Sequence, residues 1–314
     1  MNGTPQESLE PNAPPAMTTG MSRRTWLKRS AAAIAAGAAG IGLYSRSFEP
    51  HWVEVVRRTL PIEGLPASLE GKTLVQISDI HIGDRVSETF LIDWFQRVTQ
   101  WQPEFVVMTG DVVSTREDNS LPLNAMRRVL KHFPQGTLGT LGVLGNHDYG
   151  KFWTDNHVAN VVAGMATDVG IQLLRNARCE IAGLQIVGFD DLWSPNFGHQ
   201  KVIAETDITR PTITLCHNPD AADLPIWGGY RGWILSGHTH GGQCKAPFLR
   251  PPLLPVKNRN YAAGEIALAD GRHLYVNRAL GHSLQIRFNV RPEITVFQLN
   301  REHTDQPAQN STPG

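Results

Sequence analysis

Residues 73–81 read Thr-Leu-Val-Gln-Ile-Ser-Asp-Ile-His, an apolar and β-branched run that ends in two polar side chains, Asp79 and His81. Such a run predicts a strand that stops where the polar residues begin. The pattern recurs in four later segments: Gly110-Asp111, Gly145-Asn-His-Asp148, Cys216-His217 and Gly237-His-Thr-His240. Polar groups that follow strands in this way are expected to lie along one edge of a sheet.

The spacing inside two of these motifs has a geometric reading. Side chains two residues apart project to the same side of an extended strand, so Asp79 and His81 are expected to touch one ion together. His238 and His240 have the same spacing. The pattern is therefore typical of a metal site built where strands turn into loops.

Glycine precedes two of the polar residues, Asp111 and Asn146. Only glycine permits the sharp, close-packed turns that would bring several ligands within bonding distance of two ions. We therefore expect Gly110 and Gly145 to be steric requirements.

The charges of the candidate ligands indicate an anionic substrate. Two divalent ions carry four positive charges, Asp79 and Asp111 supply two negative charges, and a bridging hydroxide supplies a third. The cluster keeps one net positive charge, which suits a phosphate that bridges the ions while the hydroxide attacks phosphorus in line. An aspartate at position 146 would weaken this attraction.

The order and wording of these motifs, above all G-N-H-D and G-H-T-H-G-G-Q, resemble the calcineurin-like metallophosphoesterase superfamily from about residue 53 to about residue 299. The resemblance implies an α/β fold, a four-layer α/β/β/α sandwich with two mixed sheets. It also implies two divalent metal ions, manganese, iron or zinc, which the ligand types do not distinguish. The implied first metal has the ligands Asp79, His81, Asp111 and His240, and the second has Asp111, Asn146, His217 and His238.

In that family the equivalent of His147 stays off the metals and faces the substrate, where it stabilises the transition state or protonates the leaving oxygen. Some members orient it with an aspartate a few residues beyond the bridging one, whereas this chain has Ser114 and Thr115 there. Asp148 is the alternative, as a hydrogen-bond acceptor that braces the loop, since catalytic histidines usually need such a partner.

Each motif alone is common and favours a turn or a helix cap. All five in order make that structural interpretation improbable. The histidines outside the motifs are interpreted as surface or ordinary core residues: His51, His132, His157, His199, His273, His282 and His303.

The N-terminal segment resembles a twin-arginine export signal. Ser22-Arg-Arg-Thr-Trp-Leu-Lys28 precedes a weakly apolar run over residues 31–44 that is short for a membrane span. We therefore expect the twin-arginine translocase as a partner, a periplasmic or cell-envelope location, and a possible membrane anchor. The predicted organisation is a disordered extension over residues 1–20, the signal or anchor over 21–48, a metallophosphoesterase domain over 49–300 and a disordered tail over 301–314.

Composition excludes some function classes. The 29 Lys and Arg balance 29 Asp and Glu, so no global field draws the chain to nucleic acid. Its three cysteines do not predict a disulfide framework. Cys216 is expected to be a small buried residue, with a bridge to Cys244 as the alternative.

Strands and helices are expected to alternate in the first half, whereas the second half is richer in strands. The clearest helix spans residues 87–101, with Ser87 as its N-cap. Further helices are expected at 123–133 and 158–169. Strands are expected at 53–60, 73–78, 105–109, 140–144, 184–189, 212–216, 233–236, 273–277 and 294–299. The proline-rich residues 247–255 predict a loop beside the site.

Residues 275–281 resemble a segment of a bacterial branch that includes exported phosphodiesterases and UDP-diacylglucosamine diphosphatases. Arg278 and Arg287 are candidates for phosphate or headgroup contact, with an ordinary salt bridge as the alternative. Three functions remain: an exported phosphodiesterase acting on a cell-envelope, lipid-headgroup or nucleotide substrate; a lipid-sugar nucleotide diphosphatase on the cytoplasmic side; and a catalytically silent metal-binding scaffold.

Overall fold

The computed structural model describes residues 21–115 and 120–302. The predicted disordered segment 1–20 and residues 303–314 of the predicted tail lie outside the described residues, as does His303. The chain divides into two compact units, one ending at Gly42 and the other beginning at Leu43.

The first unit and the start of the second contain one long helix, α1 (Arg23–Ser47). Its described side chains are largely exposed, including Trp26, Leu27 and Ile34. Among the described residues, no helix combines the length and the apolar character needed to cross a membrane.

The second unit contains two six-stranded mixed sheets. The first sheet has the order β1 (Glu54–Ile62), β12 (Glu293–Arg301), β2 (Thr73–Ile77), β3 (Phe105–Thr109), β4 (Gly139–Val143) and β5 (Gln172–Leu173). The second has the order β10 (Gly264–Ala267), β11 (His273–Val276), β9 (Trp233–Ser236), β8 (Thr212–Leu215), β7 (Leu184–Gly188) and β6 (Ala177–Ile181). Neighbouring strands are parallel except at β12–β2, β6–β7 and β10–β11.

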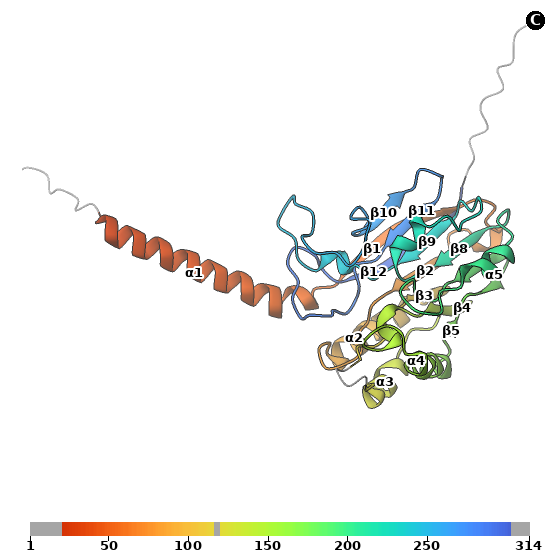
Figure 1. Ribbon diagram of the computed structural model, residues 1–314, viewed down its shortest axis with the longest axis horizontal. Coiled ribbons are helices and arrows are strands. Elements are labelled where there is room, and N and C mark those ends of the chain that lie inside the picture. The colour runs from red at the N-terminus through yellow and green to blue at the C-terminus, as the bar shows by residue number, and fades with distance from the viewer. Residues whose placement is uncertain (1–20, 116–119, 303–314) are drawn as a thin grey trace, which may run out of the picture. The chain divides into compact units, whose positions relative to one another are not determined.

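The helices of this unit are α2 (Glu88–Gln100), α3 (Leu123–Leu130), α4 (Asn156–Asp168) and α5 (His199–Ala204). Short 3₁₀ segments connect other elements: η1 (Glu49–His51), η2 (Ala67–Leu69), η3 (Asn146–Tyr149), η4 (Pro219–Asp223) and η5 (His240–Gly242). Figure 1 shows α2, α3 and α4 together on one side of the strands.

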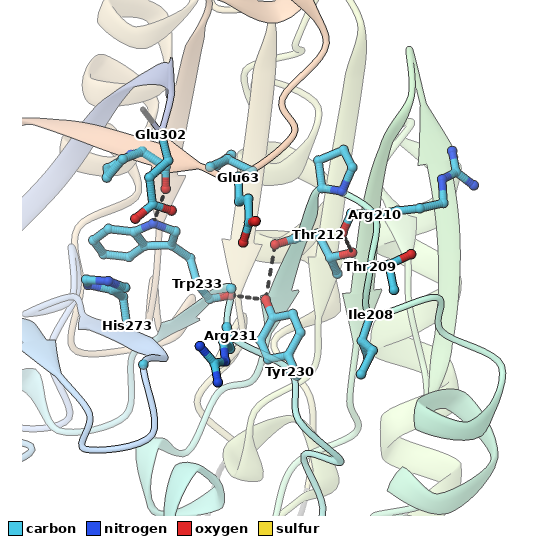
Figure 2. Close-up of a pocket in the computed structure, with 15 residues that line it drawn as sticks. Glu63, Ile208, Thr209, Arg210, Thr212, Tyr230, Arg231, Trp233, His273 and Glu302 are labelled. Carbon is cyan, nitrogen blue, oxygen red and sulfur yellow. Dashed lines mark hydrogen bonds between the residues drawn. The ribbon is translucent and has the colours of Figure 1, made fainter. Parts of the chain in front are cut away.

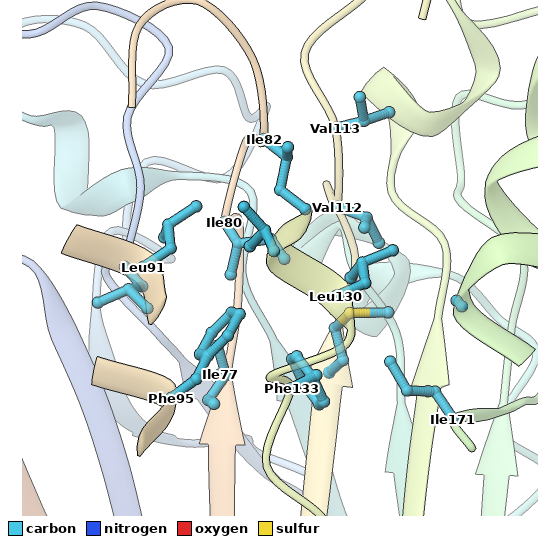
Figure 3. Close-up of a cluster of buried hydrophobic side chains, with 14 of the residues drawn as sticks. Ile77, Ile80, Ile82, Leu91, Phe95, Val112, Val113, Leu130, Phe133 and Ile171 are labelled. Carbon is cyan, nitrogen blue, oxygen red and sulfur yellow. The ribbon is translucent and has the colours of Figure 1, made fainter. Parts of the chain in front are cut away.

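Three hydrophobic clusters define the layers. Ile77 of β2, Val106 of β3 and Phe95 of α2 belong to the cluster between the first sheet and its helices. Figure 3 shows part of this cluster, with Ile77 next to Phe95. A second cluster fills the space between the two sheets. The third covers the outer face of the second sheet and includes Val202 of α5. The predicted four-layer α/β/β/α sandwich is therefore confirmed.

Most predicted elements are confirmed to within one to three residues at each end. Ser87 is the N-cap of α2, since its side chain accepts a hydrogen bond from the backbone N–H of Phe90. The helix predicted to reach Phe133 ends at Leu130, because Pro134 disfavours helical backbone just before it. Strand β12 continues through Arg301, a residue that the sequence had placed in the tail.

The short elements β5, β6, β10 and α5 were not predicted. β5 has only two residues, and α5 has six residues without a side-chain cap. β6 and β10 are edge strands with alternating burial. β5 and α5 are too short to show a periodicity, whereas β6 and β10 lack the continuous apolar run that marked the buried strands.

Candidate metal centre

The motif residues lie at one edge of both sheets. Asp79 and Asp111 follow the carboxyl ends of β2 and β3, and Asn146 follows β4. In the second sheet His217 follows β8 and His238 follows β9. Since β2, β3 and β4 are parallel, as are β8 and β9, the ends of each set meet at one edge. All seven predicted ligands are buried: Asp79, His81, Asp111, Asn146, His217, His238 and His240.

Their donor atoms form two groups that share one aspartate. Asp79, His81, Asp111 and His240 offer atoms that all lie within 4.8 Å of one another, as do Asp111, His217 and His238. Asn146 joins the second group, because its Oδ1 lies 3.2 Å from His217 Nε2. The structure thus brings together all seven residues, and each group could hold a metal ion.

The extended-strand explanation for the D-x-H and H-x-H spacings is wrong. Asp79, His81, His238 and His240 have φ values of 50°, 48°, 70° and 51°, so their backbone is left-handed. The strands end before the ligands, at Ile77 and Ser236. Asp79 and His81 nevertheless belong to one group, whereas His238 and His240 belong to different groups.

The two glycines are steric requirements, as expected. A Cβ on Gly110, which has a φ of 90°, would lie 2.6 Å from His217 Nδ1. A Cβ on Gly145 would lie 2.2 Å from Asp111 Oδ1. Any side chain at these positions would push against the candidate ligands themselves.

Hydrogen bonds outside the cluster fix how three imidazoles are presented. Nδ1 of His217 donates to the carbonyl oxygen of Thr109 at 2.7 Å, and Nε2 of His238 donates to the carbonyl oxygen of Pro255 at 2.9 Å. Nδ1 of His81 lies 3.0 Å from Ser114 Oγ. Such outer partners orient metal-binding histidines and set their tautomers.

The inward-facing atoms satisfy a test for a bound cation. His217 Nε2 and His238 Nδ1 lie 3.2 Å apart, and in the neutral tautomers set by their carbonyl partners both carry lone pairs. Two facing lone pairs repel unless a proton or a cation lies between them. His81 Nε2 and His240 Nε2 form a similar pair at 3.1 Å, with Asp79 Oδ1 3.2 Å from His240. This donor set of imidazoles, carboxylates and one amide fits divalent ions.

The electrostatics of the site favour ionised carboxylates. Burial acts to raise the pKa of Asp79, but His240 and His217 outweigh it and lower that pKa to about 2. Burial also opposes ionisation of Asp111, yet His217 and His147 hold its pKa well below the ordinary value. Burial lowers the pKa of His238 to about 3. At His217, by contrast, Asp111 and Asp79 outweigh burial and hold the pKa well above the ordinary value, so that in the absence of metal a proton lies between His217 and His238. A bound cation would take the place of that proton, and the ionised carboxylates and neutral His238 are already in the states that metal ligands require.

His147 lies beside the two groups without belonging to either. Its backbone N–H donates to Asp111 Oδ1 at 2.9 Å, and its ring centroid is 5.1 Å from that of His81. Asp148 accepts from the backbone N–H groups of Gly145 and Val113 at 2.8 and 3.1 Å. The predicted bracing of the loop by Asp148 is confirmed, while Ser114 contacts His81.

Three residues near the centre were missed by sequence reasoning. Asp191 is fully buried just after β7, and one of its oxygens has no hydrogen-bond partner among the described residues. Burial raises its pKa to about 6. Trp193 packs edge-on against His238 at 4.5 Å and stacks on Trp153 at 4.7 Å. The apolar run of β7 followed by Asp190-Asp191 was a signal that could have found Asp191.

The two candidate arginines have structural partners. Arg278 pairs with Glu293 and, at 3.1 Å, with Glu54, which supports the salt-bridge alternative. Arg287 is fully buried and donates to backbone carbonyl oxygens, including that of Gly281 at 2.7 Å. The hypothesis that Arg287 contacts phosphate is therefore wrong, because its guanidinium is enclosed by the loop that it supports.

The cysteines do not pair in the structure. Cys216 is buried, as expected, and its thiol donates to the carbonyl oxygen of Asn218. Cys216 and Cys244 are both free, so the alternative of a bridge between them is wrong.

Comparison with known proteins agrees with this geometry. Residues 72–242 match the family model of the calcineurin-like phosphoesterases. The chain is 34% identical over 295 residues to the uncharacterized metallophosphoesterase YkuE of Bacillus subtilis, covering 89% of this chain and 98% of that protein. It is 30% identical over 286 residues to the phosphodiesterase YaeI of Escherichia coli, covering 89% and 99%.

A third relative is the UDP-2,3-diacylglucosamine pyrophosphatase LpxG of Chlamydia trachomatis. The identity is 27% over 310 residues, covering 82% of this chain and 92% of that protein. The match to the family model spans more than half of the chain and ends at the last glycine of η5. Because of this match and the similarity to YkuE, this chain belongs to the calcineurin-like phosphoesterase family.

Proposed function

We propose that this protein is a metal-dependent phosphodiesterase that hydrolyses a P–O bond of a cell-envelope, lipid-headgroup or nucleotide substrate. The observation that carries the proposal is the convergence of seven buried donor side chains, from five strand ends in two sheets, on a pair of adjacent sites. A relative named as a phosphodiesterase, 30% identical over nearly its whole length, supports the reaction class.

The proposed ligands are divided between two divalent ions. Asp79, His81 and His240 hold the first ion, Asn146, His217 and His238 hold the second, and Asp111 is shared. When bound, the ions supply Lewis-acid stabilisation of the phosphate and lower the pKa of the attacking water. The donor types admit manganese, iron or zinc.

His147 is the proposed catalytic residue. Its position beside His81 and its backbone hydrogen bond to Asp111 place the loop next to both groups while the ring stays outside them. There it can donate a proton to the oxygen of the leaving group as the P–O bond breaks. Asp148 keeps the loop in place through its two backbone hydrogen bonds.

The reaction test is a substrate screen on protein loaded with manganese. We expect bis-p-nitrophenyl phosphate to be hydrolysed faster than the monoester p-nitrophenyl phosphate or a pyrophosphate. Activity should fall in His147→Ala and disappear in Asp111→Ala, whereas His157→Ala, an exposed histidine on α4, serves as the matched control. If neither substitution at the site changes the rate, the mechanism is wrong.

Export by the twin-arginine route is part of the proposal. Its support is the Ser22-Arg-Arg motif before the weakly apolar run, together with the advantage of folding around metal before translocation. The translocase is the proposed partner, and the N-terminal segment is the proposed membrane anchor. A fusion of the first 48 residues to a reporter should be exported in a manner that depends on Arg23 and Arg24.

A diphosphatase acting on a UDP-diacylglucosamine-type substrate at the cytoplasmic side is the second candidate. It is favoured by the relative named as a UDP-2,3-diacylglucosamine pyrophosphatase. Retention of the reporter inside the cell and preferential pyrophosphate cleavage would together select it. A silent scaffold is disfavoured, since the donor set is complete.

A further inference from the structure

Two loops beside the metal centre form one protruding surface, which we name the rim surface: residues 243–257 and 281–288. Gln243 joins them, because its side chain donates to the carbonyl oxygens of Leu284 and Ile286 at 3.0 Å. The backbone N–H of Lys245 donates to the carbonyl oxygen of Phe288, also at 3.0 Å. The two loops are therefore held together as a unit.

The rim surface is also fixed to the site. Pro255 accepts the hydrogen bond of His238, and Asp220 accepts from the backbone N–H groups of Lys257 and Asn258. Arg259 donates to the carbonyl oxygen of Pro251 at 2.7 Å. These hydrogen bonds hold the first loop at Gln243, Pro251, Pro255 and Lys257, and most of the residues between these positions are exposed.

The projecting residues are large and apolar. Phe248 is as exposed as in a free peptide, at 105%, and Leu253 is 79% exposed. Leu249, Leu284 and Ile286 add further exposed apolar area. Soluble proteins seldom keep several large apolar side chains exposed on adjoining loops unless the loops contact a partner or a membrane.

The charge of these loops identifies the kind of partner. Residues 237–263 and 277–292 contain no Asp or Glu, although the whole chain has a net charge of +0. Lys245 and Arg250 flank Phe248 and Leu249, while the nearby carboxylate of Asp220 is occupied by backbone N–H groups. Apolar side chains mixed with basic ones match the interface of an anionic bilayer, where rings enter the headgroup region and cations meet lipid phosphates.

The entry of the chain into the second unit lies on the same surface. The carbonyl oxygen of Ser45 accepts from the backbone N–H of Arg287 at 2.8 Å, and that of Arg46 accepts from the side chain of Gln285. Both residues belong to the second unit. The first residues of the second unit are thus hydrogen-bonded to the 281–288 loop of the rim surface.

We propose that the rim surface docks on an anionic phospholipid membrane and holds the metal edge against lipid-borne phosphate esters. The apolar residues insert among the headgroups, and Lys245 and Arg250 contact lipid phosphates. Binding of the rim surface to the membrane does not depend on the metal chemistry, whereas the presentation of lipid-borne phosphate esters rests on the proposed function.

The test uses the full chain and vesicles of phosphatidylethanolamine and phosphatidylglycerol, with phosphatidylcholine vesicles for comparison. Hydrogen–deuterium exchange of the peptide covering residues 245–257 should slow with the anionic vesicles and not with the neutral ones. This local readout separates the rim surface from any binding by α1. Slowing confined to residues 23–47 would overturn the proposal.

Variants give the second readout. Phe248→Ser with Leu253→Ser should weaken vesicle binding at least tenfold, and Lys245→Gln with Arg250→Gln should remove most of its salt dependence. The control is Leu138→Ser with Ile208→Ser, two exposed apolar residues, at 42% and 40%, that precede β4 and β8 at the opposite edge. Thermal unfolding of each variant verifies its fold.

Three outcomes of these experiments would overturn the docking. Equal weakening in the control pair would show that any exposed apolar residue contributes. A dimer of the wild type that Phe248→Ser disrupts, without slowed exchange on vesicles, would assign the surface to a second copy of the chain. If vesicles do not bind while the wild type hydrolyses the soluble diester, the docking fails and the proposed function stands.

Discussion

The two opposite edges of the same sheets differ in what their side chains do. At the metal edge, the carboxyl ends of β2, β3, β4, β8 and β9 carry buried donor atoms that face one another. At the other edge, a cavity of about 640 Å³ opens near the start of β8, β9 and β11. Figure 2 shows this cavity, with Tyr230 donating to the carbonyl oxygens of Trp233 and Thr212.

The cavity offers less reactive groups than the metal edge. Glu63 and Arg231 at the cavity are exposed, and Arg210 is already paired with Glu180 at 2.7 Å. At the metal edge, by contrast, facing lone pairs of His217 and His238 need a cation or a proton. Chemistry is therefore indicated by convergent, buried and incompletely satisfied donors, and not by volume.

The largest loss of activity at the metal edge is expected when Asp111, the ligand shared by both groups, is replaced. Asp111→Asn should lower diesterase kcat/KM more than roughly 10⁴-fold, because one side chain serves both groups and several kcal/mol of transition-state stabilisation depend on the ions. Metal content measured by mass spectrometry should fall in parallel. Full activity with two bound ions would show that Asp111 is not shared.

The next largest effect is expected at His147. His147→Ala should lower kcat by about 10²- to 10³-fold, the usual contribution of a general acid, with metal content unchanged. An ester with a better leaving group should be affected less, since it needs the proton less. Loss of metal from this variant would instead make His147 a ligand.

Backbone packing at the metal edge gives a stability prediction. Gly110→Ala should lower the free energy of unfolding by about 3 kcal/mol, because the new Cβ meets His217 Nδ1 at 2.6 Å and the φ of 90° is strained for alanine. Chemical denaturation of the metal-free protein measures this change. Gly164→Ala is the matched control, since a Cβ there meets nothing within 4 Å.

A smaller, pH-dependent effect is expected from His282, which lies in the rim surface. Burial lowers its pKa to about 4, from the ordinary histidine value of 6.5. Its Nε2 donates to the carbonyl oxygen of Arg85 at 2.9 Å. The unfolded chain therefore takes up this proton first as the pH falls, so that the stability present above pH 6.5 is lost between pH 6.5 and 4.

The size of this loss is on the order of 2 kcal/mol. His282→Gln keeps a donor for Arg85 but cannot titrate, so its unfolding free energy should decline less over that interval. Urea unfolding at pH 7.5 and pH 4.5 measures the difference between the variant and the wild type. Parallel pH profiles would contradict the assignment.

The smallest effect is expected at the opposite edge. Glu63→Gln with Arg231→Gln should leave diesterase kcat/KM within about twofold, because both side chains are exposed and lie at the edge opposite the metal groups. The free energy of unfolding should also change little, by about 0.5 kcal/mol or less. A large loss of activity would mean that the residues of the cavity affect the reaction at the metal edge, which would contradict the functional difference between the two edges.

Sequence patterns predicted much of this molecule. The strand runs 73–78, 105–109 and 233–236 and the periodicity of α2 predicted individual elements, because burial of one face imposes a regular apolar pattern on them. The four-layer sandwich was implied by the resemblance to the metallophosphoesterases. The polar residues after those strands indicated a metal site, and the resemblance to the family implied which of them are the ligands. The order of residue types along the chain, however, does not predict the backbone conformation of the ligand residues.

The amino-acid sequence by itself determined which residues could bind metal and that a glycine had to stand before Asp111 and Asn146. Only the tertiary structure showed that the backbone is left-handed at Asp79, His81, His238 and His240, because the spacing of the motifs does not distinguish this conformation from an extended strand. It also decided that Arg287 supports a loop and that Asp191 lies at the site. These roles depend on contacts between segments distant in sequence, which exist only once the two sheets have packed together.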